Sequence, residues 1–523
     1  MTPSRSSYDV VIVGGGHNGL TAAAYLALAG KTVLILEKLG HVGGAAVSAQ
    51  AFDGIDARLS RYSYLVSLLP QRVIRDLGLD IQLQRRRYSS YTPMPGGEGG
   101  LLVDNHDAAA TASSFASIGA DADADAWPRF YDGTARLART LFPTVTEPLP
   151  TRAEARTALG DDRLWHSLIE TPIGQTVADT FSNDLVRGVV LTDALIGTFA
   201  PNIDETFAAN RCFLYHVIGN GTGDWDVPIG GMGAVTGELH RAARNAGAEV
   251  VTNAEVLSIT PDGDVEFDGG RVHAGVVLAN VAPWVLERLV SAGSTTADGS
   301  TTSRVEPVET KPEGAQVKVN LLLSRLPRLK DESVDPRAAF GGTFHINETW
   351  TQLDAAYETA AGGAIASPLP AEIYCHSLAD PSILSLELQR SGAQTLTVFG
   401  LHTPSRLTAT AAELQAAVLA SLNSVLAESV ESLLLTDAHG APTIETKTNH
   451  DIEAALGMPG GNIFHGPLAW PFAEDGDHLD TAAEQWGVAT AHPRILLCGS
   501  GAQRGGAVSG LGGHNAAMAV LQR

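Results

Sequence analysis

The sequence has few cysteines and no long apolar run. Cys212, Cys375 and Cys498 are the only thiols in 523 residues, and no CxxC pair occurs. This argues against a redox-active disulfide and against a cysteine-based zinc site. Cys498 ends the apolar stretch 495–498 and is interpreted as a core thiol. No stretch approaches the roughly 18 apolar residues of a membrane span, and nothing at the N-terminus resembles a signal peptide, so we expect a cytoplasmic protein.

Basic residues are scarce. The chain has 35 Lys and Arg against 58 Asp and Glu, which gives a formal net charge of −23. Nucleic acid and an anionic membrane would both repel such a surface, so neither is expected as an electrostatic partner. A peripheral membrane contact through an apolar patch stays open, and the oligomeric state is not indicated. Length and a hydrophobic content of 44% predict a large core and two or more domains.

Several catalytic patterns are also absent. HExxH, GxSxG and the P-loop do not occur, which argues against metalloproteases, serine hydrolases and phosphoryl transferases. His216, His345 and His402 are scattered without metal-ligand spacing. We therefore expect no metal site.

A nucleotide-binding pattern lies near the N-terminus. Residues 10–13 are an apolar run typical of a buried parallel strand, and Gly14, Gly16 and Gly19 follow at GxGxxG spacing. These positions suit a tight turn, close approach of the backbone to a pyrophosphate, and packing of helix on strand. The helix expected over 20–29 points free N–H groups at the diphosphate. The pattern predicts a dinucleotide-binding βαβ unit.

An acidic residue completes this unit. A second apolar strand over 33–36 ends at Glu37, which lies 18 residues past Gly19. At this distance a carboxylate accepts hydrogen bonds from the ribose hydroxyls.

The segment after Glu37 favours flavin over nicotinamide. Lys38 is followed by a short spacer and by Gly43, Gly44 and Ala45. Glycine permits the backbone to pass close beside a ligand. This continuation resembles that of flavin amine oxidases and phytoene-desaturase-like proteins, and nicotinamide dehydrogenases normally lack it.

A second glycine-rich segment lies near the C-terminus. A strand over 494–498 leads into a loop and then into a closing helix. The segment resembles the one that closes over the riboflavin in the same proteins. The resemblance places Gly499 and Ser500 near the ribityl phosphate, and the backbone N–H groups of about Val508 to Leu511, with Ser509 and Gly510 between them, against flavin N1 and the C2 carbonyl. A positive helix end there stabilises the negative charge of reduced flavin.

Together with the glycine-rich stretch 457–466, these segments resemble the phytoene-desaturase-like flavoprotein family. The resemblance is nearest to the branch that contains pyridine nucleotide-disulfide oxidoreductase domain-containing protein 2. It implies FAD as cofactor, with Gly14, Gly16 and Gly19 on the diphosphate, Glu37 on the adenosine ribose, Gly43 and Gly44 beside the ribityl chain and the backbone of Val256 on the adenine. Arg504 stands where related proteins carry a smaller or ring-shaped residue.

The expected fold class is α/β. A Rossmann-type FAD-binding domain, which consists of a parallel sheet with helices, is interleaved with a mixed α+β substrate domain, as in flavin amine oxidases and phytoene desaturases. We assign 1–105, 225–305 and 452–523 to the FAD-binding domain, and 106–224 and 306–451 to the helical, substrate-binding domain. Within these ranges, 291–304 is rich in serine, threonine and glycine and predicts a surface insertion.

Two residues are candidates for catalysis. Strict alternation over 315–321 predicts a half-buried strand with Gln316, Lys318 and Asn320 on one face. Lys318 either tunes the flavin or holds a water from that face, or it is an exposed surface lysine. His465 lies in the loop before the flavin-closing segment, where it serves either as an acid or base, or as a structural histidine bonded to the backbone.

The leading functional hypothesis is an FAD-dependent dehydrogenase or oxidase. It accepts a hydride at flavin N5 from a hydrophobic substrate, a polyene or isoprenoid among the options, and passes electrons to oxygen or a quinone. Three alternatives are a redox-neutral cis–trans isomerase, an amine oxidase and a non-catalytic flavoprotein that acts through partners. An aromatic pair flanking the flavin would favour the amine oxidase alternative, and no aromatic residue occurs between Gly499 and Met518.

Overall fold

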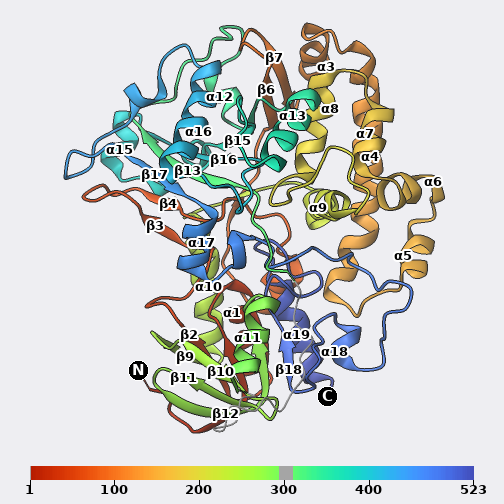
Figure 1. The fold of residues 1–523 in the computed structure, drawn as a ribbon, viewed down its shortest axis with the longest axis vertical. Coiled ribbons are helices and arrows are strands. Elements are labelled where there is room, and N and C mark those ends of the chain that lie inside the picture. Colours follow the sequence, from red (N-terminus) through yellow and green to blue (C-terminus); the bar gives the residue numbers. More distant parts are fainter. Residues whose placement is uncertain (1, 294–309) are drawn as a thin grey trace.

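The computed structural model describes residues 2–293 and 310–523. Its strands form two large sheets, one at the bottom and one at the top of Figure 1, and both labelled chain ends lie at the bottom. The surface insertion was expected over 291–304, and from residue 294 onward it lies outside the described residues. The α/β class predicted from the sequence is confirmed.

The lower sheet is the nucleotide-binding sheet. Its strands run in the order β10 (Val256–Ile259), β11 (Asp264–Phe267), β12 (Gly270–Ala279), β1 (Ser7–Val13), β2 (Val33–Glu37) and β9 (Glu249–Thr252), and β18 (Ile495–Leu497) also pairs with β12. The pairs that involve β1, β2, β9 and β18 are parallel, whereas β11 is antiparallel to both neighbours. The sheet is therefore assembled from three distant parts of the chain.

Helices cover both faces of this sheet, so its strands are apolar on both sides. Val10 and Ile12 pack on the side of α1 (His17–Leu28), α10 (Met232–Asn245) and α19 (Leu511–Leu521). Val11 and Val13 pack on the opposite side, against α11 (Pro283–Gly293). A strand buried on both faces reads as a continuous apolar run, as residues 10–13 do.

The upper sheet is mixed and mainly antiparallel. Its order is β17 (Ile444–Lys447), β13 (Val317–Leu323), β16 (Gln394–Gly400), β15 (Ala371–Tyr374), β14 (Thr343–Ile346), β6 (Tyr88–Pro93) and β7 (Gly100–Asp104). Two short ribbons complete the strands: β3 (Ser48–Gln50) with β4 (Arg58–Ser60), and β5 (Leu83–Gln84) with β8 (Val227–Pro228).

β6 pairs with β14 and β7 pairs with β6, so both strands belong to the upper sheet although they precede the expected domain boundary at residue 105. One expectation about this sheet is wrong. The strand over 315–321 is not half-buried, since all seven residues of β13 are buried between β16 and β17. The alternation did not indicate exposure here, because backbone segments cover the polar face of β13 and accept hydrogen bonds from its side chains.

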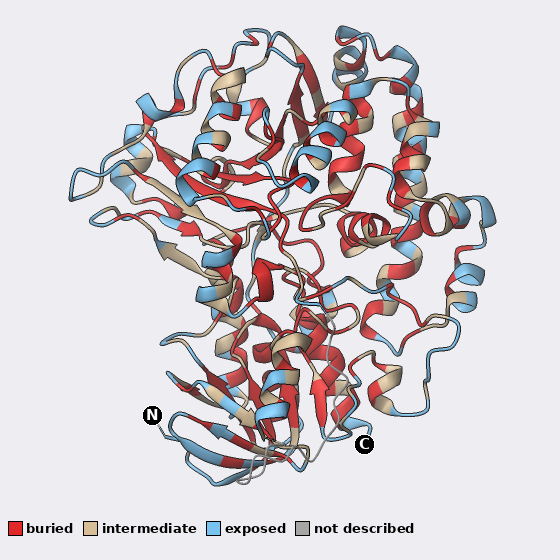
Figure 2. Ribbon diagram, in the orientation of Figure 1, coloured by how far each residue is buried: buried red, intermediate tan, exposed pale blue. Residues whose placement is uncertain are grey.

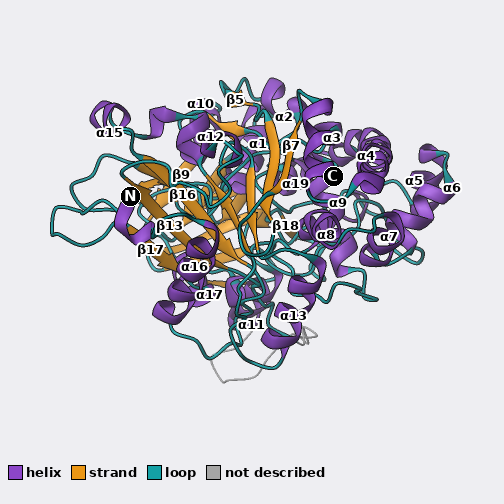
Figure 3. Ribbon diagram, turned by 90° about the horizontal axis from the view of Figure 1, so that it is seen from above, coloured by secondary structure: helices purple, strands orange, loops and turns teal. Residues whose placement is uncertain are grey.

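The remaining helices pack around the sheets and on one another, and α9 (Ala208–Val217) is itself almost entirely buried. Those on the right of Figure 1 and Figure 3 are α3 (Ala108–Ser117), α4 (Asp121–Leu141), α5 (Arg152–Leu159), α6 (Asp162–Trp165), α7 (Ile173–Thr180), α8 (Asp184–Leu191) and α9 (Ala208–Val217). The others are α2 (Gln71–Asp76), α12 (Pro336–Ala339), α13 (Trp350–Ala361), α14 (His376–Ala379), α15 (Leu386–Ser391), α16 (Ala411–Val425), α17 (Asn449–Leu456) and α18 (Ala482–Gln485). Figure 2 shows buried residues concentrated on their inward faces and in the strands. Across residues 2–293 and 310–523, no helix combines the length and apolarity needed to cross a bilayer.

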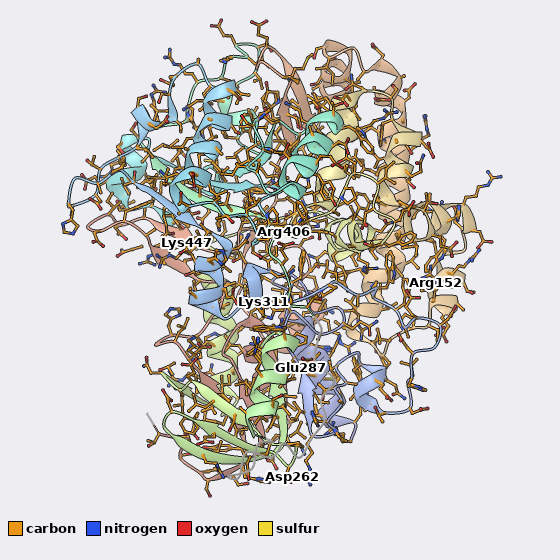
Figure 4. The ribbon with its side chains drawn as sticks, in the orientation of Figure 1. Arg152, Asp262, Glu287, Lys311, Arg406 and Lys447 are labelled. Carbon is orange, nitrogen blue, oxygen red and sulfur yellow. The ribbon has the colours of Figure 1, made fainter. Side chains whose placement is uncertain are left out.

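Ion pairs lie where the two sheets meet. Lys311 pairs with Glu453 of α17 at 2.6 Å, and Arg406 pairs with Glu313. Figure 4 labels both cations, which lie between the lower and the upper sheet. Partly exposed pairs of this kind contribute about 0–1 kcal/mol each, so they orient the junction more than they stabilise it.

Candidate functional site

The first turn of the nucleotide unit forms one end of a long cavity. Gly14 adopts φ +100°, and α1 begins directly after Gly16. A Cβ on Gly19 would lie 2.3 Å from the carbonyl oxygen of Gly14, so only glycine permits this packing of helix on strand. Gly14 and Gly16 line the cavity together with His17. The free N–H groups of the first turn of α1 therefore face a space suited to a phosphate.

Glu37 closes this end of the cavity. One of its carboxylate oxygens accepts a hydrogen bond from the N–H of Gly15 at 2.7 Å, and the other accepts one from the N–H of Leu39 at 2.8 Å. A carboxylate has about four acceptor positions, so capacity remains for ligand hydroxyls. Lys38 and Val256 line the cavity beside it, and Lys38 pairs with Glu255 at 3.3 Å.

The Gly43-Gly44 segment lies against the phosphate turn. The N–H of Gly43 donates to the carbonyl of Gly15 at 2.9 Å, and both glycines have positive φ. A Cβ on Gly44 would lie 3.2 Å from the Cα of Gly16, so side chains on these residues would close the cradle. Gly44 and Ala45 line the cavity, whereas Gly43 supports them from behind.

The C-terminal segment forms the opposite wall. Ser500 and Val508 line the cavity, and Gly510, at φ +71°, begins α19. Helix α19 packs closely on α1, because a Cβ on Gly513 would lie 1.9 Å from the carbonyl oxygen of Asn18. Gly499, Ser509 and Gly510 do not line the cavity, and neither do Gly19 and Gly43.

Asn280 was missed by the sequence analysis. It follows β12, lines the cavity, and donates from Nδ2 to the carbonyl of Gly14 at 2.9 Å. It thus fixes the turn from a strand that is adjacent in the sheet and far away in the sequence. Its position directly after an apolar strand, at the carboxyl end of a parallel sheet, is the signal that could have identified it.

Arg504 links the C-terminal segment to the helical region. Its guanidinium is buried and donates to the carbonyl oxygens of Thr144, Glu147 and Trp486. Burial lowers its pKa to about 10. The arginine therefore acts structurally, as a clamp between the closing loop and residues 144–147.

Lys318 is deeply buried, so the exposed-surface interpretation is wrong. The residue is 1% exposed, and its Nζ donates to the carbonyl oxygens of Ser60 at 2.8 Å and Ser63 at 3.0 Å. Burial lowers the pKa of its ammonium group to about 7. Lys318 does not line the cavity itself, but Ser63 and Phe399, whose ring lies 5.0 Å from Nζ, both do. It stands directly behind the cavity wall.

His465 lines the cavity and is half-buried. Its Nδ1 has no hydrogen-bond partner, so the interpretation as a histidine held by the backbone through this atom fails. Burial, with a smaller contribution from His17, lowers the pKa of the His465 imidazole to about 4. A neutral ring with a free nitrogen is thus available to a ligand.

The other end of the cavity is apolar and aromatic, and it reaches the upper sheet. Its lining includes Tyr62, Tyr64, Leu65, Leu68, Ile196, Tyr215, Trp225, Phe399, Met458, Ile463 and Phe464. The rings of Tyr64 and Trp225 stack at 5.8 Å. Aromatic residues therefore line the cavity although none comes from the C-terminal segment.

These features fit FAD. A glycine cradle suits the diphosphate, and the carboxylate of Glu37, which has spare acceptor capacity, suits the ribose. The buried Nδ1 of His465 has no hydrogen-bond partner, so it can form a hydrogen bond with a ligand. The cradle is continuous with an apolar chamber that a flavin ring and a substrate could share. The cradle and the chamber together therefore suit an FAD-dependent oxidoreductase.

Comparison with known proteins agrees with this site. Residues 12–73 match the family described as NAD(P)-binding Rossmann-like domain. The uncharacterized protein Rv0897c of Mycobacterium tuberculosis is 54% identical over 540 aligned positions, which cover 100% of this chain and 98% of that protein. Pyridine nucleotide-disulfide oxidoreductase domain-containing protein 2 of Mus musculus is 28% identical over 567 positions, covering 99% and 94%.

A solved structure supports the fold. Cyclohexylamine oxidase from Brevibacterium oxydans has a TM-score of 0.57 at 15% identity, with 99% of this chain and 100% of that chain covered. The chain therefore belongs to the family of the mycobacterial protein, and it is similar over nearly its whole length to pyridine nucleotide-disulfide oxidoreductase domain-containing protein 2.

Proposed function

We propose that the protein oxidises a hydrophobic small molecule, a polyene or isoprenoid among the candidates, and passes the electrons to oxygen or a quinone. FAD, when bound, supplies the hydride acceptor at flavin N5. The observation that carries the proposal is the apolar and aromatic chamber that continues directly from the nucleotide cradle. Such a chamber binds an apolar substrate by burial and excludes water from the reacting atoms.

The polar groups near the chamber have separate roles in this proposal. His465 holds a hydrogen bond to the cofactor or substrate through Nδ1, and its low pKa keeps it neutral at physiological pH. A neutral imidazole places no charge beside the apolar substrate until it accepts the proton that the substrate loses, when it becomes an imidazolium cation. Lys318 is a positioning residue, because it fixes the wall segment 60–63 rather than reaching the cavity.

Amine oxidation is the second candidate. The chamber has an aromatic lining, which favours an amine oxidase. This lining comes from Tyr62, Tyr64 and Trp225 and not from the C-terminal segment. Aromatic faces attract ammonium groups and also pack against polyenes, so the lining alone does not separate the two substrates. The fold is shared with cyclohexylamine oxidase, which adds no substrate information at 15% identity.

The test is anaerobic reduction of the bound flavin. The purified holoprotein is mixed with NADH, with NADPH, with a polyene presented in detergent, and with cyclohexylamine, and the oxidised flavin band is followed. Bleaching by the polyene alone supports the leading proposal, and bleaching by the amine alone supports the second. Bleaching by nicotinamide, with isomerised and unoxidised polyene as product, replaces both with a cis–trans isomerase. No bleaching by any electron donor favours a non-catalytic flavoprotein.

We further propose a cytoplasmic protein that contacts membranes only peripherally when it collects an apolar substrate. The large exposed apolar side chains are scattered over separate elements and are Leu28, Met94, Ile203, Leu257, Leu386 and Leu521. Isolated residues of this kind are ordinary, so any contact is weak. Flotation with neutral and with anionic liposomes at two salt concentrations tests this, and strong binding at high salt would contradict a weak contact.

A further inference from the structure

A second cavity lies beside the first one. It has a volume of about 270 Å³ and shares Tyr64, Ile196, His216 and Trp225 with the lining of the first cavity. Its lining is mainly polar, whereas that of its neighbour is mainly apolar. Three of the lining residues are Asp193, His345 and Glu372, of which the last two are buried and Asp193 is half-buried.

His345, Glu348 and Glu372 form a compact buried cluster. His345 lies in β14, Glu348 follows that strand, and Glu372 lies in the neighbouring strand β15. Nδ1 of His345 lies 2.8 Å from a carboxylate oxygen of Glu348 and 3.8 Å from one of Glu372. The three side chains are 4%, 0% and 2% exposed.

No cationic side chain compensates these carboxylates. Within residues 2–293 and 310–523, neither Glu348 nor Glu372 forms an ion pair with a lysine or arginine. Arg86 lines the same cavity but donates to the carbonyl of Trp225 and to the hydroxyl of Thr343. Buried carboxylates without a cation are costly, so they require either shared protons or a bound ion.

One atom of the cluster is left without any partner. Oε1 of Glu348 is buried and has no hydrogen bond, although the other oxygen of the same carboxylate contacts His345. The hydrogen bonds among the side chains therefore leave the cluster incompletely satisfied.

The geometry matches that of metal ligands. One donor atom from each of the three residues lies within 4.8 Å of the other two. Ligands at metal bond lengths of about 2.1 Å are separated by roughly 3–4.2 Å, so small side-chain shifts complete the site. The hydroxyl of Thr192, 3.3 Å from a Glu372 oxygen, lies beside them. One imidazole with two carboxylates and no thiolate suits Mn²⁺, Fe²⁺ or Zn²⁺ better than a soft cation.

We propose that His345, Glu348 and Glu372 bind one divalent first-row transition-metal cation, which enters through the second cavity. This differs from the expectation of no metal site, because the spacing of histidines along the chain does not reveal ligands that come from two strands. The site lies apart from the FAD cradle.

The test uses the FAD-loaded full-length protein. After treatment with a chelator and desalting, the protein is titrated with Mn²⁺, and free Mn²⁺ is followed by electron paramagnetic resonance. Zn²⁺ is then added as a competitor. We expect one equivalent of Mn²⁺ to bind to the wild type and to be displaced by Zn²⁺. Absence of stoichiometric binding to the wild type would overturn the proposal and leave a cluster that shares protons.

Variants locate the site. E348Q and E372Q replace a ligand by an isosteric amide and are each expected to weaken Mn²⁺ binding by at least about tenfold. The matched control is D264N, because Asp264 contacts Nδ1 of His273 at 2.9 Å in an exposed histidine–carboxylate pair. Wild-type affinity in both cluster variants, at unchanged FAD content, would place the ion elsewhere and refute the assignment.

Discussion

The burial of Lys318 predicts an unusual dependence of stability on pH. The pKa of this lysine is about 7 in the folded protein, against 10.5 for the unfolded chain. Between these values the unfolded chain carries the proton and the folded protein does not, so raising the pH favours folding. Below pH 7 both states are charged, and the folded protein bears the full cost of a buried ammonium group.

The size of the effect follows from these two values. A depression from 10.5 to about 7 corresponds to about 5 kcal/mol at 1.36 kcal/mol per pKa unit. About 2 kcal/mol of this is regained between pH 7 and pH 9. Unfolding entropy for a chain of 523 residues is on the order of 1.1 kcal/mol per K, so the melting temperature shifts by roughly 2 °C.

The assay compares Lys318→Met with the wild type. Melting is followed by release of flavin fluorescence at pH 7, 8 and 9. The difference in melting temperature between the wild type and Lys318→Met is plotted against pH, because this subtraction removes the contribution of other titrating groups. We expect the wild type to gain about 2 °C on the variant over this range. Lys447→Met, in β17 beside Glu445, is the matched control for loss of a lysine in this sheet. A constant difference for Lys318→Met would refute a neutral folded lysine.

Three further predictions concern the cavity. Gly19→Ala places a Cβ 2.3 Å from the carbonyl oxygen of Gly14, so FAD affinity should fall at least about tenfold. The flavin content of the purified protein measures this, and full flavin content would contradict the packing argument. Asn280→Ala removes one hydrogen bond to the same turn, and we expect FAD to bind about two- to tenfold more weakly by fluorescence titration. Asn280→Asp removes the Nδ2 donor, so unchanged FAD affinity in this variant would count against the hydrogen-bonding role. His465→Ala should slow anaerobic flavin reduction by substrate about 100-fold in stopped flow, and an unchanged rate would exclude His465 from proton transfer.

The nucleotide site could be predicted because its residues are local in the sequence. Gly14, Gly16 and Glu37 lie within one βαβ unit, whose turn and strand spacing are fixed by backbone geometry. The sequence pattern therefore carries both the fold and the ligand. The burial of Cys498 as a core thiol is confirmed for the same reason, since it follows a short apolar strand of that sheet.

The chamber could not be predicted, because its walls come from segments that meet only in the folded chain. Tyr64, Trp225 and Phe399 lie far apart in the sequence, and nothing local to any of them indicates a shared cavity. Lys318 shows the same limit. Its alternation with apolar neighbours is real, but the exposure of its face depends on whether residues 60–63 cover it.

Pairing of β12 with β18 has a consequence for how the protein assembles. Val277 lies beside Ile495 in the lower sheet, while most of the upper sheet is encoded between them. Such non-local pairing makes folding slow, since a long loop must close before the contact forms. No continuous fragment of the chain contains the whole nucleotide sheet without the upper one. Gene fragments that express only one of the two parts should therefore yield aggregates rather than a separable FAD-binding module.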